Sequence, residues 1–133
     1  MTLKRFGVSL DEETMKVLDE LVVDENLPNR SRGIAYLVNK YKVEEKWKSD
    51  EHVVGAIVVT YDHSNTNLLK EVSQLQHSYN CLVFSGQHIH LDEHNTLEVI
   101  AVRGTASKLQ KLSNKYKGLK GVKNVELVMS GTV

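Results

Sequence analysis

The chain is poor in the features that define several large classes of protein. Its 133 residues include one cysteine, Cys81, and one proline, and aromatic residues make up 6% of the total. A single cysteine permits no disulfide within the chain, which favours a reducing compartment, so we expect a cytoplasmic protein. No stretch approaches the ~20 apolar residues of a membrane helix, and no signal-type apolar core follows the first residues. We therefore expect no membrane partner.

The chain also lacks a net charge, because 17 basic side chains balance 17 acidic ones. This excludes binding of nucleic acid or anionic lipid through bulk positive charge, but a local basic patch remains compatible with it. Histidine, in contrast, is unevenly distributed, since all six histidines lie between His52 and His94. The two halves of the chain therefore differ in chemistry. We predict one domain over 1–47 and a second over 52–133.

Residues 3–10 have the pattern of a strand with one apolar face. Their side chains alternate, with Phe6, Val8 and Leu10 set against Arg5, Gly7 and Ser9. A lone strand exposes unpaired backbone groups along its edge, and a unit of about 45 residues rarely supports its own core. Pairing with the same strand of a second chain solves both problems. We predict an intertwined dimer with an antiparallel two-stranded ribbon, an element that fits the DNA major groove.

Two helices are predicted after this strand. The acidic stretch 11–13 suits a first helical turn, with Ser9 or Asp11 as its cap. A breaker at 27–30 precedes a second helix, with Ser31 at or next to its cap position. Each helix has one apolar stripe, formed by Met15, Leu18 and Val22 in the first and by Ile34, Leu37, Val38 and Tyr41 in the second. In the charge-rich segment 42–51 we expect the helix to end and a short linker to follow.

This half resembles a ribbon-helix-helix DNA-binding domain. The resemblance rests on residues 5–10, the acidic first helix and the sequence Asn29-Arg30-Ser31 before the second helix. A helix N-terminus is also a phosphate site. The DNA-binding residues that the resemblance implies are Arg5, Gly7, Ser9, Arg30 and Ser31. The alternative is a dimerisation hairpin that does not touch DNA.

The second half has the pattern β-α-β-β-α-β. Its strands are predicted over 53–61, 81–91, 96–103 and 122–129, and its helices over 65–77 and 105–116. This is the order of a ferredoxin-like fold, which small-molecule-sensing ACT-type regulatory domains also use. The fold class is therefore α+β, a ribbon-helix-helix unit followed by an ACT-like domain.

The chemistry of the second half lies around the predicted hairpin. His88 and His90 are two residues apart on a strand, so both imidazoles project from one face about 7 Å apart. That spacing suits two ligands of one metal ion, and imidazole binds Zn, Cu, Ni and Fe. His77 ends the preceding helix and cannot be placed by local geometry. The alternative is that His88 and His90 are ordinary surface histidines.

Gln76-His77, followed by the segment 87–98, closely resembles the sensing domain of the nickel-responsive transcriptional regulators. Asp62-His63 and the segment 118–123 also resemble that family, and the likeness covers nearly the whole chain. It implies a homotetramer, a dimer of dimers, with one nickel ion expected per chain at the tetramer interface. In the family, two histidines and a cysteine of one chain and one histidine of another hold the metal. The positions that correspond to the histidines are His88 and His90 in one chain and His77 in its neighbour.

Thr96 occupies the position of the family's cysteine ligand, and a threonine hydroxyl is a poor metal ligand at neutral pH. Three imidazoles then remain, and water or another side chain must complete a set that suits Zn, Co or six-coordinate Ni. Cys81 lies seven residues before His88, on the opposite face of the predicted strand. We expect it to be a small apolar core residue. Arg32 and Tyr36 replace acidic residues that hold a cation in the family, so that cation site is expected to be absent.

These observations predict a metal-responsive, sequence-specific DNA-binding transcriptional regulator of the nickel type, which represses metal-uptake genes. The first alternative keeps the fold but is gated by Zn or Co, by a small organic ligand, or by nothing. A second alternative, disfavoured because 52–129 has the pattern of a complete packed domain, is an antitoxin. An enzyme is not expected, because no nucleophile, base and orienting residue have a supporting spacing and no Gly-rich phosphate loop occurs.

Overall fold

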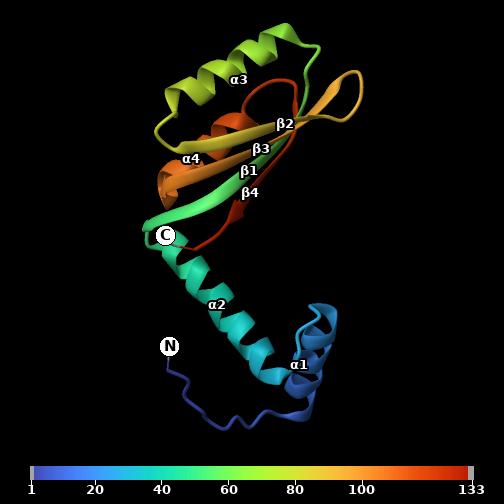
Figure 1. The fold of residues 1–133 in the computed structure, drawn as a ribbon, viewed down its shortest axis with the longest axis vertical. Coiled ribbons are helices and arrows are strands. Elements are labelled where there is room, and N and C mark those ends of the chain that lie inside the picture. The colour runs from blue at the N-terminus through green and yellow to red at the C-terminus, as the bar shows by residue number, and fades with distance from the viewer. Residues whose placement is uncertain (1, 132–133) are drawn as a thin grey trace. The chain divides into compact units, whose positions relative to one another are not determined.

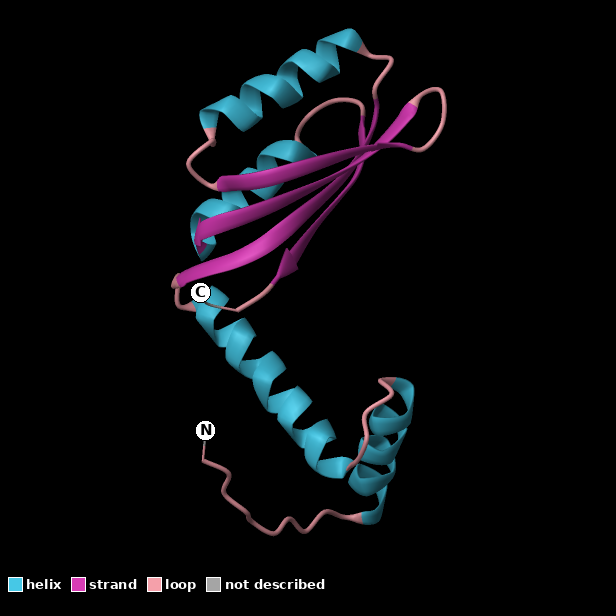
Figure 2. Cartoon of the chain, viewed as in Figure 1, coloured by secondary structure: helices cyan, strands magenta, loops and turns pink. Residues whose placement is uncertain are grey.

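The computed structural model describes residues 2–131, which contain one four-stranded sheet and four helices (Figures 1 and 2). Contacts divide the chain into two compact units, one up to Tyr41 and the other from Lys42 onward. Among the described residues, no helix is both long and apolar enough to cross a membrane.

The first unit contains helix α1 (Glu12–Asp24) and the beginning of α2 (Arg30–Lys48). The carboxylate of Asp11 caps α1 by accepting a hydrogen bond from the Thr14 amide at 2.7 Å. Of the two caps predicted for this helix, Ser9 and Asp11, the second is therefore confirmed. The cap of α2 is Asn29, whereas the sequence prediction placed it at or next to Ser31. The Asn29 side chain accepts the Arg32 amide at 2.9 Å, so Ser31 lies within the first helical turn.

Residues 2–10 form neither helix nor strand in the single chain. A strand requires a hydrogen-bonded neighbouring strand. In the predicted ribbon, that neighbour is the same segment of a second chain. Most of the apolar side chains of this segment are correspondingly exposed, Phe6 at 76% among them. The ribbon therefore stays a prediction.

The second unit has the predicted order of elements, with small differences at their ends. Its strands are β1 (His52–Asp62), β2 (Val83–His90), β3 (Asn95–Thr105) and β4 (Val122–Met129), and its helices are α3 (Thr66–Ser78) and α4 (Ala106–Lys117). All neighbouring strands are antiparallel, in the order β2-β3-β1-β4. This arrangement is the ferredoxin-like one and confirms the mixed α+β class.

The core of this unit lies between one face of the sheet and the two helices. Alternate residues of β1 and β3 face it, since successive side chains of a strand point to opposite sides. The buried cluster includes Val53, Ile57, Val59 and Tyr61 of β1, Ile100 and Val102 of β3, Leu68 and Val72 of α3, and Leu109, Leu112 and Tyr116 of α4. The even-numbered positions of β3 that continue this inward face are Thr96 and Glu98, which are also buried.

The segment predicted as a linker is largely helical, because α2 continues to Lys48. Trp47, which is 4% exposed, belongs to the core of the second unit, and its indole N–H donates to the Ser130 carbonyl at 2.8 Å. The sequence around Trp47 is polar because most of this part of the helix faces solvent, and Trp47 is the one large residue that contacts the core of the second unit. The sequence analysis therefore missed Trp47 as a core residue.

Candidate functional site

Three of the six histidines, all of which belong to the second unit, line a pocket of about 390 Å³. It is lined by His63 from the loop after β1, His88 and His90 from β2, Thr96 from β3 and Gln76 from α3, among others. The register of the sheet brings these residues together, since His88 pairs with Glu98 and His90 with Thr96, while Tyr61 pairs with Thr96 from the other side. Residues distant in sequence thus meet at one end of the sheet.

Glu98 is a buried carboxylate beneath the pocket, with 1% of its surface exposed. One of its oxygens lies 3.1 Å from Nε2 of His88 and accepts a hydrogen bond from the Gln76 amide at 2.5 Å. The other oxygen accepts the Tyr61 hydroxyl at 3.3 Å. A buried carboxylate is costly unless its oxygens are hydrogen-bonded, and these three partners meet that requirement.

Tyr61 remains a hydrogen-bond donor over the physiological pH range. Burial, and then the negative charge and hydrogen bond of Glu98, raise the pKa of Tyr61 to about 12. The phenol therefore keeps its proton and donates a hydrogen bond to Glu98. Since the contact with Glu98 uses Nε2 of His88, Nδ1 of that ring is left to face other partners.

Thr96 is 1% exposed, and its hydroxyl lies 2.8 Å from Nδ1 of His63. The His63 ring is in turn stacked on the ring of His90, with the centroids 4.5 Å apart and the planes 15° from parallel. Half of the side chain of His88 is exposed. The pocket therefore has buried polar residues at its base and imidazoles at its opening.

His88 and His90 both line this pocket, in agreement with the expectation that they project from one face of the strand. His77 does not line it, although its neighbour Gln76 does, because consecutive residues of a helix point in different directions. Cys81 is exposed in the turn before β2. The expectation that Cys81 packs in the core was wrong, because β2 begins only at Val83.

Sequence reasoning assigned no role in the site to His63 or Glu98. Glu98 carried a usable signal, since it shares its strand parity with Ile100 and Val102 and so had to face the core. His63 belongs to a segment that resembles the family, but no local pattern placed it in the pocket, because only the pairing of Asp62 with Asn95 brings the following loop beside the start of β3.

The donor set of the pocket, three imidazoles with no thiolate among the lining residues, suits Ni, Co or Zn. Within residues 2–131, however, no three His, Cys, Asp or Glu side chains stand in positions that would hold a metal ion. The stacked rings of His63 and His90 explain this, because the nitrogens of parallel rings do not converge. Binding of a metal ion thus requires at least one imidazole to turn, a motion that exposed side chains make readily.

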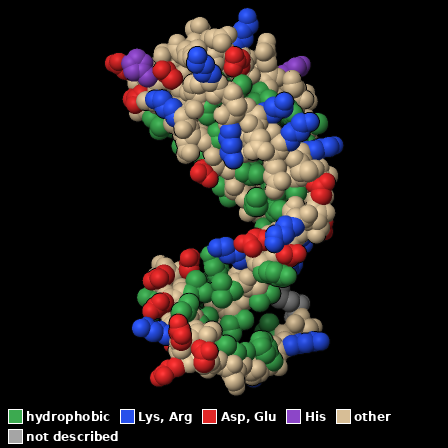
Figure 3. Space-filling model, turned by 180° about the vertical axis from the view of Figure 1, so that it is seen from behind, with side chains coloured by type: hydrophobic (Ala, Val, Ile, Leu, Met, Phe, Trp, Pro, Cys, Tyr) green, Lys and Arg blue, Asp and Glu red, His purple; other side chains and the backbone are tan. Residues whose placement is uncertain are grey.

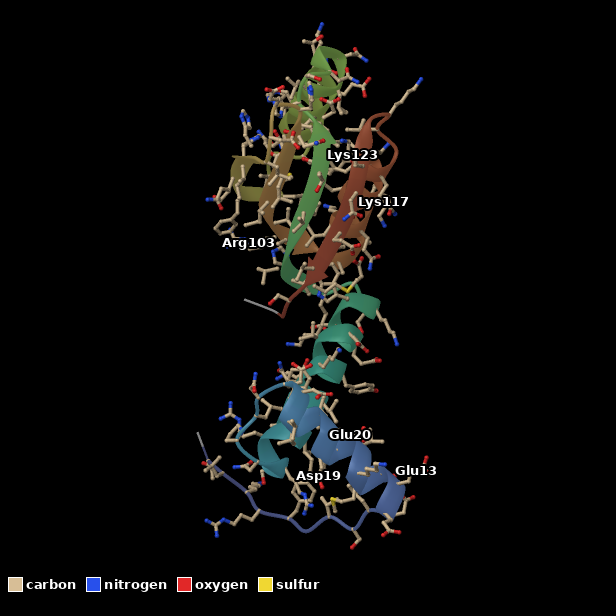
Figure 4. All side chains as sticks on the ribbon, turned by 90° about the vertical axis from the view of Figure 1, so that its right-hand side faces the viewer. Glu13, Asp19, Glu20, Arg103, Lys117 and Lys123 are labelled. Atoms are coloured by element: carbon tan, nitrogen blue, oxygen red, sulfur yellow. The ribbon has the colours of Figure 1, made fainter. Side chains whose placement is uncertain are left out.

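The residues expected to bind DNA lie in the first unit. Arg5, Gly7 and Ser9 are all exposed in the segment before α1. Arg30 is different, because its guanidinium forms a two-point ion pair with Asp19 of α1, at 2.8 and 3.0 Å. Asp19 projects from α1, as do Glu13 and Glu20 (Figure 4), and the hydrogen bond with Arg30 lowers the pKa of Asp19. Arg30 thus joins the two helices.

Comparison with known proteins gives the family of the chain. Residues 54–130 match the model of the NikR C terminal nickel binding domain. A protein of Syntrophus aciditrophicus, named "putative nickel-responsive regulator", is 42% identical over 96% of this chain and 93% of its own. A protein of the same name from Thermococcus kodakarensis is 38% identical over 99% and 96%. The chain belongs to the family of nickel-responsive regulators. The part that matches the family's nickel-binding domain contains every residue of the pocket.

One solved structure resembles part of the fold of this chain. An uncharacterized protein from Thermotoga maritima superposes with a TM-score of 0.55 over 59% of this chain and 98% of its own, at 15% sequence identity. At that identity the likeness concerns the fold alone. The relatives of the nickel-responsive regulator family, in contrast, extend over both units of the chain.

Proposed function

We propose that this nickel-responsive regulator is a cytoplasmic, metal-responsive and sequence-specific DNA-binding transcriptional repressor of metal-uptake genes. One observation carries the proposal: His88 and His90 line the same pocket, and His88 is held from below by the buried carboxylate of Glu98. Ligating histidines almost always have their second ring nitrogen bonded to a carboxylate, carbonyl or water. The names of the relatives support the same reading.

The metal ligands that we propose are His88 and His90 of one chain and His77 of a second copy. His77 lies at the end of α3 and contributes nothing to its own pocket, which leaves it available to another chain. A nickel ion, one per chain, would supply Lewis acidity and link imidazoles of two copies. Because Thr96 offers no thiolate, Co and Zn are the alternative metals.

The proposed tetramer is supported by the open face of the sheet. Both helices of the second unit pack on the other face, and the open face contains apolar residues such as Val58, Leu97 and Val99, which are only partly buried. Val128, which pairs with Ala56 of β1 on this face, is exposed at its edge. A group of apolar side chains on one exposed face of a sheet is typical of an interface between chains.

The proposed DNA-binding dimer is supported by the first unit. Residues from 3–10, α1 and α2 border a hollow of about 800 Å³, around which hydrophobic side chains gather in Figure 3. Phe6, Val8 and Val38 are exposed apolar residues that border this hollow. A second copy of the segment 3–10 would cover them and form the ribbon, with Arg5 and Ser9 facing the DNA bases or phosphates. Ser31 and Arg30 would lie near the phosphate backbone.

The metal would control DNA binding by shifting the population between two arrangements of the DNA-binding dimers. Copies linked through their histidines would favour the arrangement of the two DNA-binding dimers that matches the spacing of the operator half-sites, provided the two arrangements differ in metal affinity. Metal affinity and operator affinity would then be linked reciprocally.

The decisive experiment is a DNA-binding assay on the region upstream of the protein's own gene, with Ni, Co, Zn and a chelator in parallel. We expect tight binding with metal and weak binding with the chelator. Equal binding in all arms would identify an ungated regulator, and the absence of binding in every arm would contradict the proposed binding to this upstream region.

Arg5→Ala tests the ribbon in the same assay. Loss of a base contact and one cation per chain should weaken operator binding by about 1–3 kcal/mol and reduce its salt dependence. Lys16→Ala is the matched control, since it removes a positive charge from the exposed side of α1. If Arg5→Ala binds like the wild type at physiological salt, the ribbon is not the reading element.

A further inference from the structure

Helix α4 lies in a stretch of the chain that has basic but no acidic side chains. Residues 99–125 contain seven of the 17 basic residues and none of the 17 acidic ones. Six of the seven are exposed lysines of α4 and of the turn and strand that follow it, Lys108, Lys111, Lys115, Lys117, Lys120 and Lys123. A chain without net charge therefore has a local basic surface on its second unit, and Figure 3 shows Lys and Arg side chains spread over the visible face of that unit.

Three of these lysines lie on one side of α4. Lys108, Lys111 and Lys115 have the spacing i, i+3, i+7, which places side chains on the same side of a helix. The opposite side is buried in the core of the unit. Beside the lysines, an open hollow of about 340 Å³ is lined by polar residues of α4 alone. We call the exposed side of the helix the α4 stripe, and its residues are Ser107, Lys108, Gln110, Lys111, Asn114 and Lys115.

The stability of the helix does not explain the lysines of the α4 stripe. The first turn of a helix favours acidic side chains, but that of α4 has none and includes Lys108. Lysines four residues apart, such as Lys111 and Lys115, repel each other. Within the described part of the chain, no carboxylate forms an ion pair with any of the three, and Lys108 influences Asp50 only at longer range. An anionic partner would offset this repulsion.

The residue types of the stripe favour DNA phosphates as that partner. Lys, Ser, Asn and Gln side chains are among the usual donors to phosphate oxygens, and the stripe consists of these four types. The core of a protein interface is instead depleted in Lys and enriched in aromatic residues, which the stripe lacks. A lipid surface is also disfavoured, because the apolar side of α4 is already buried in the core and has no surface to insert.

The length of the stripe also suits a DNA duplex. Lys108, Lys111 and Lys115 span about 10 Å along the helix axis. A duplex has about one negative charge per 1.7 Å of its axis, so the three ammonium groups can face several phosphates at once. Since α4 packs on the face of the sheet opposite to the open face proposed for the tetramer, the stripe stays exposed in that assembly.

We propose that the α4 stripe contacts the phosphate backbone of bound DNA, at positions where the protein reads no base. Such contacts add affinity and salt dependence but no sequence information. This inference rests on the proposed function, because it concerns the DNA that the same regulator binds.

The test is DNA binding by the full-length protein with Lys111→Gln and Lys115→Gln, in the presence of nickel. Binding is titrated over a range of salt concentrations on the upstream region and on a scrambled fragment of the same length. Each phosphate contact contributes about 0.9 to the slope of log K against log salt. The variant should therefore lose nearly two units of slope for each stripe that touches DNA, and at low salt its affinity for both fragments should fall by about tenfold or more.

The ratio of the two affinities should stay the same in this variant, since a lost phosphate contact weakens binding to all sequences alike. Lys42→Gln with Lys70→Gln is the matched control, because it removes two exposed lysines of α2 and α3. It should bind like the wild type. Melting curves show whether each variant is folded.

Three results would overturn the proposal. The first is wild-type affinity and slope in the α4 variant, and the second is an equal loss in the control variant. The third is a loss on the upstream region alone, because a phosphate contact does not depend on sequence. Poly-glutamate provides an arm for an acidic protein: if it binds the wild type but not the α4 variant, while DNA binding is the same in both, the partner is an acidic protein segment.

Failure of the proposed function gives a different result. If the wild type binds the upstream region and the scrambled fragment equally, sequence-specific regulation fails, whatever the α4 variant does. If the wild type prefers the upstream region and the α4 variant binds both fragments like the wild type, only the role of the α4 stripe is wrong.

Discussion

At the scale of single residues, two buried polar side chains determine the character of the pocket. Glu98 is bonded to His88, Gln76 and Tyr61, and Thr96 is bonded to His63. A cysteine at position 96 would replace a hydroxyl with a soft donor facing the same opening. The preference of the site among metals should therefore depend on this one residue.

Thr96→Cys tests that dependence. The unmutated protein with Ni(II) should lack the intense thiolate-to-metal charge-transfer band, and it should discriminate weakly against Zn and Co. The variant should show the band and gain selectivity for nickel, as measured by absorption spectra and competition titrations. Thr66→Cys, at the exposed start of α3, adds a thiol elsewhere and should show no band. A strong band in the unmutated protein would mean that Cys81 reaches the metal.

At the scale of elements, helix α4 is capped from a distant part of the sequence. Its own cap residue, Thr105, makes no side-chain cap hydrogen bond, but the carboxylate of Asp50 accepts the Ser107 amide at 2.7 Å. Asp50 has a φ of 56°, a conformation that Asp and Asn tolerate better than most residues. The residue thus both turns the chain before β1 and satisfies an amide of α4.

Asp50→Asn should remove an acid dependence of stability. The hydrogen bonds to Ser107 lower the pKa of Asp50 below its ordinary 3.8. The charged cap therefore stabilises the fold above the unfolded pKa, and this contribution is lost as pH falls through the lower folded pKa. Asparagine keeps the acceptor without the charge, so the variant should melt lower at neutral pH and lose less on acidification. Glu126→Gln, which changes an exposed side chain of β4, is the control. If the melting temperatures of the wild type and Asp50→Asn change in parallel with pH, the charge of Asp50 does not stabilise α4.

Helix α2 contributes to the second unit through Trp47. Trp47→Ala should lower the free energy of unfolding of that unit by about 3–5 kcal/mol, because it leaves a cavity and frees the Ser130 carbonyl. Lys48→Ala, on the exposed side of the same turn, should change it little. Chemical denaturation followed by circular dichroism measures both. Equal midpoints for the two variants would show that Trp47 is not part of the core.

At the scale of the whole molecule, assembly should reside in the second unit. A fragment that starts at Lys42 keeps Trp47, whereas one that starts at Glu51 loses it, so the structure moves the useful boundary towards the N-terminus. We expect residues 42–133 to be folded and tetrameric at micromolar concentration in a sedimentation experiment. A monomer would remove the basis for a metal site shared between chains.

From the first helix onward, the sequence alone determined the order of the elements, because hydrophobic periodicity and caps are local properties. It placed β4 at its observed ends, and it identified His88 and His90 as neighbours on one strand face, because a strand alternates its side chains. It missed the end of α2 at Lys48 and the burial of Trp47, since one contact residue leaves no periodic pattern. It also placed Cys81 in a strand that begins two residues later.

Only the tertiary structure decided which side chains meet. The pairing of β1 with β3 places His63 beside Thr96, and the pairing of β2 with β3 places His88 beside Glu98. The register of β1 against β3 depends on contacts between segments more than thirty residues apart, which no local pattern encodes, whereas His88 and Glu98 meet across a hairpin. His88 and His90 were therefore visible in the sequence, and the inward direction of Glu98 could be read from its strand, but the contact between His63 and Thr96 could not.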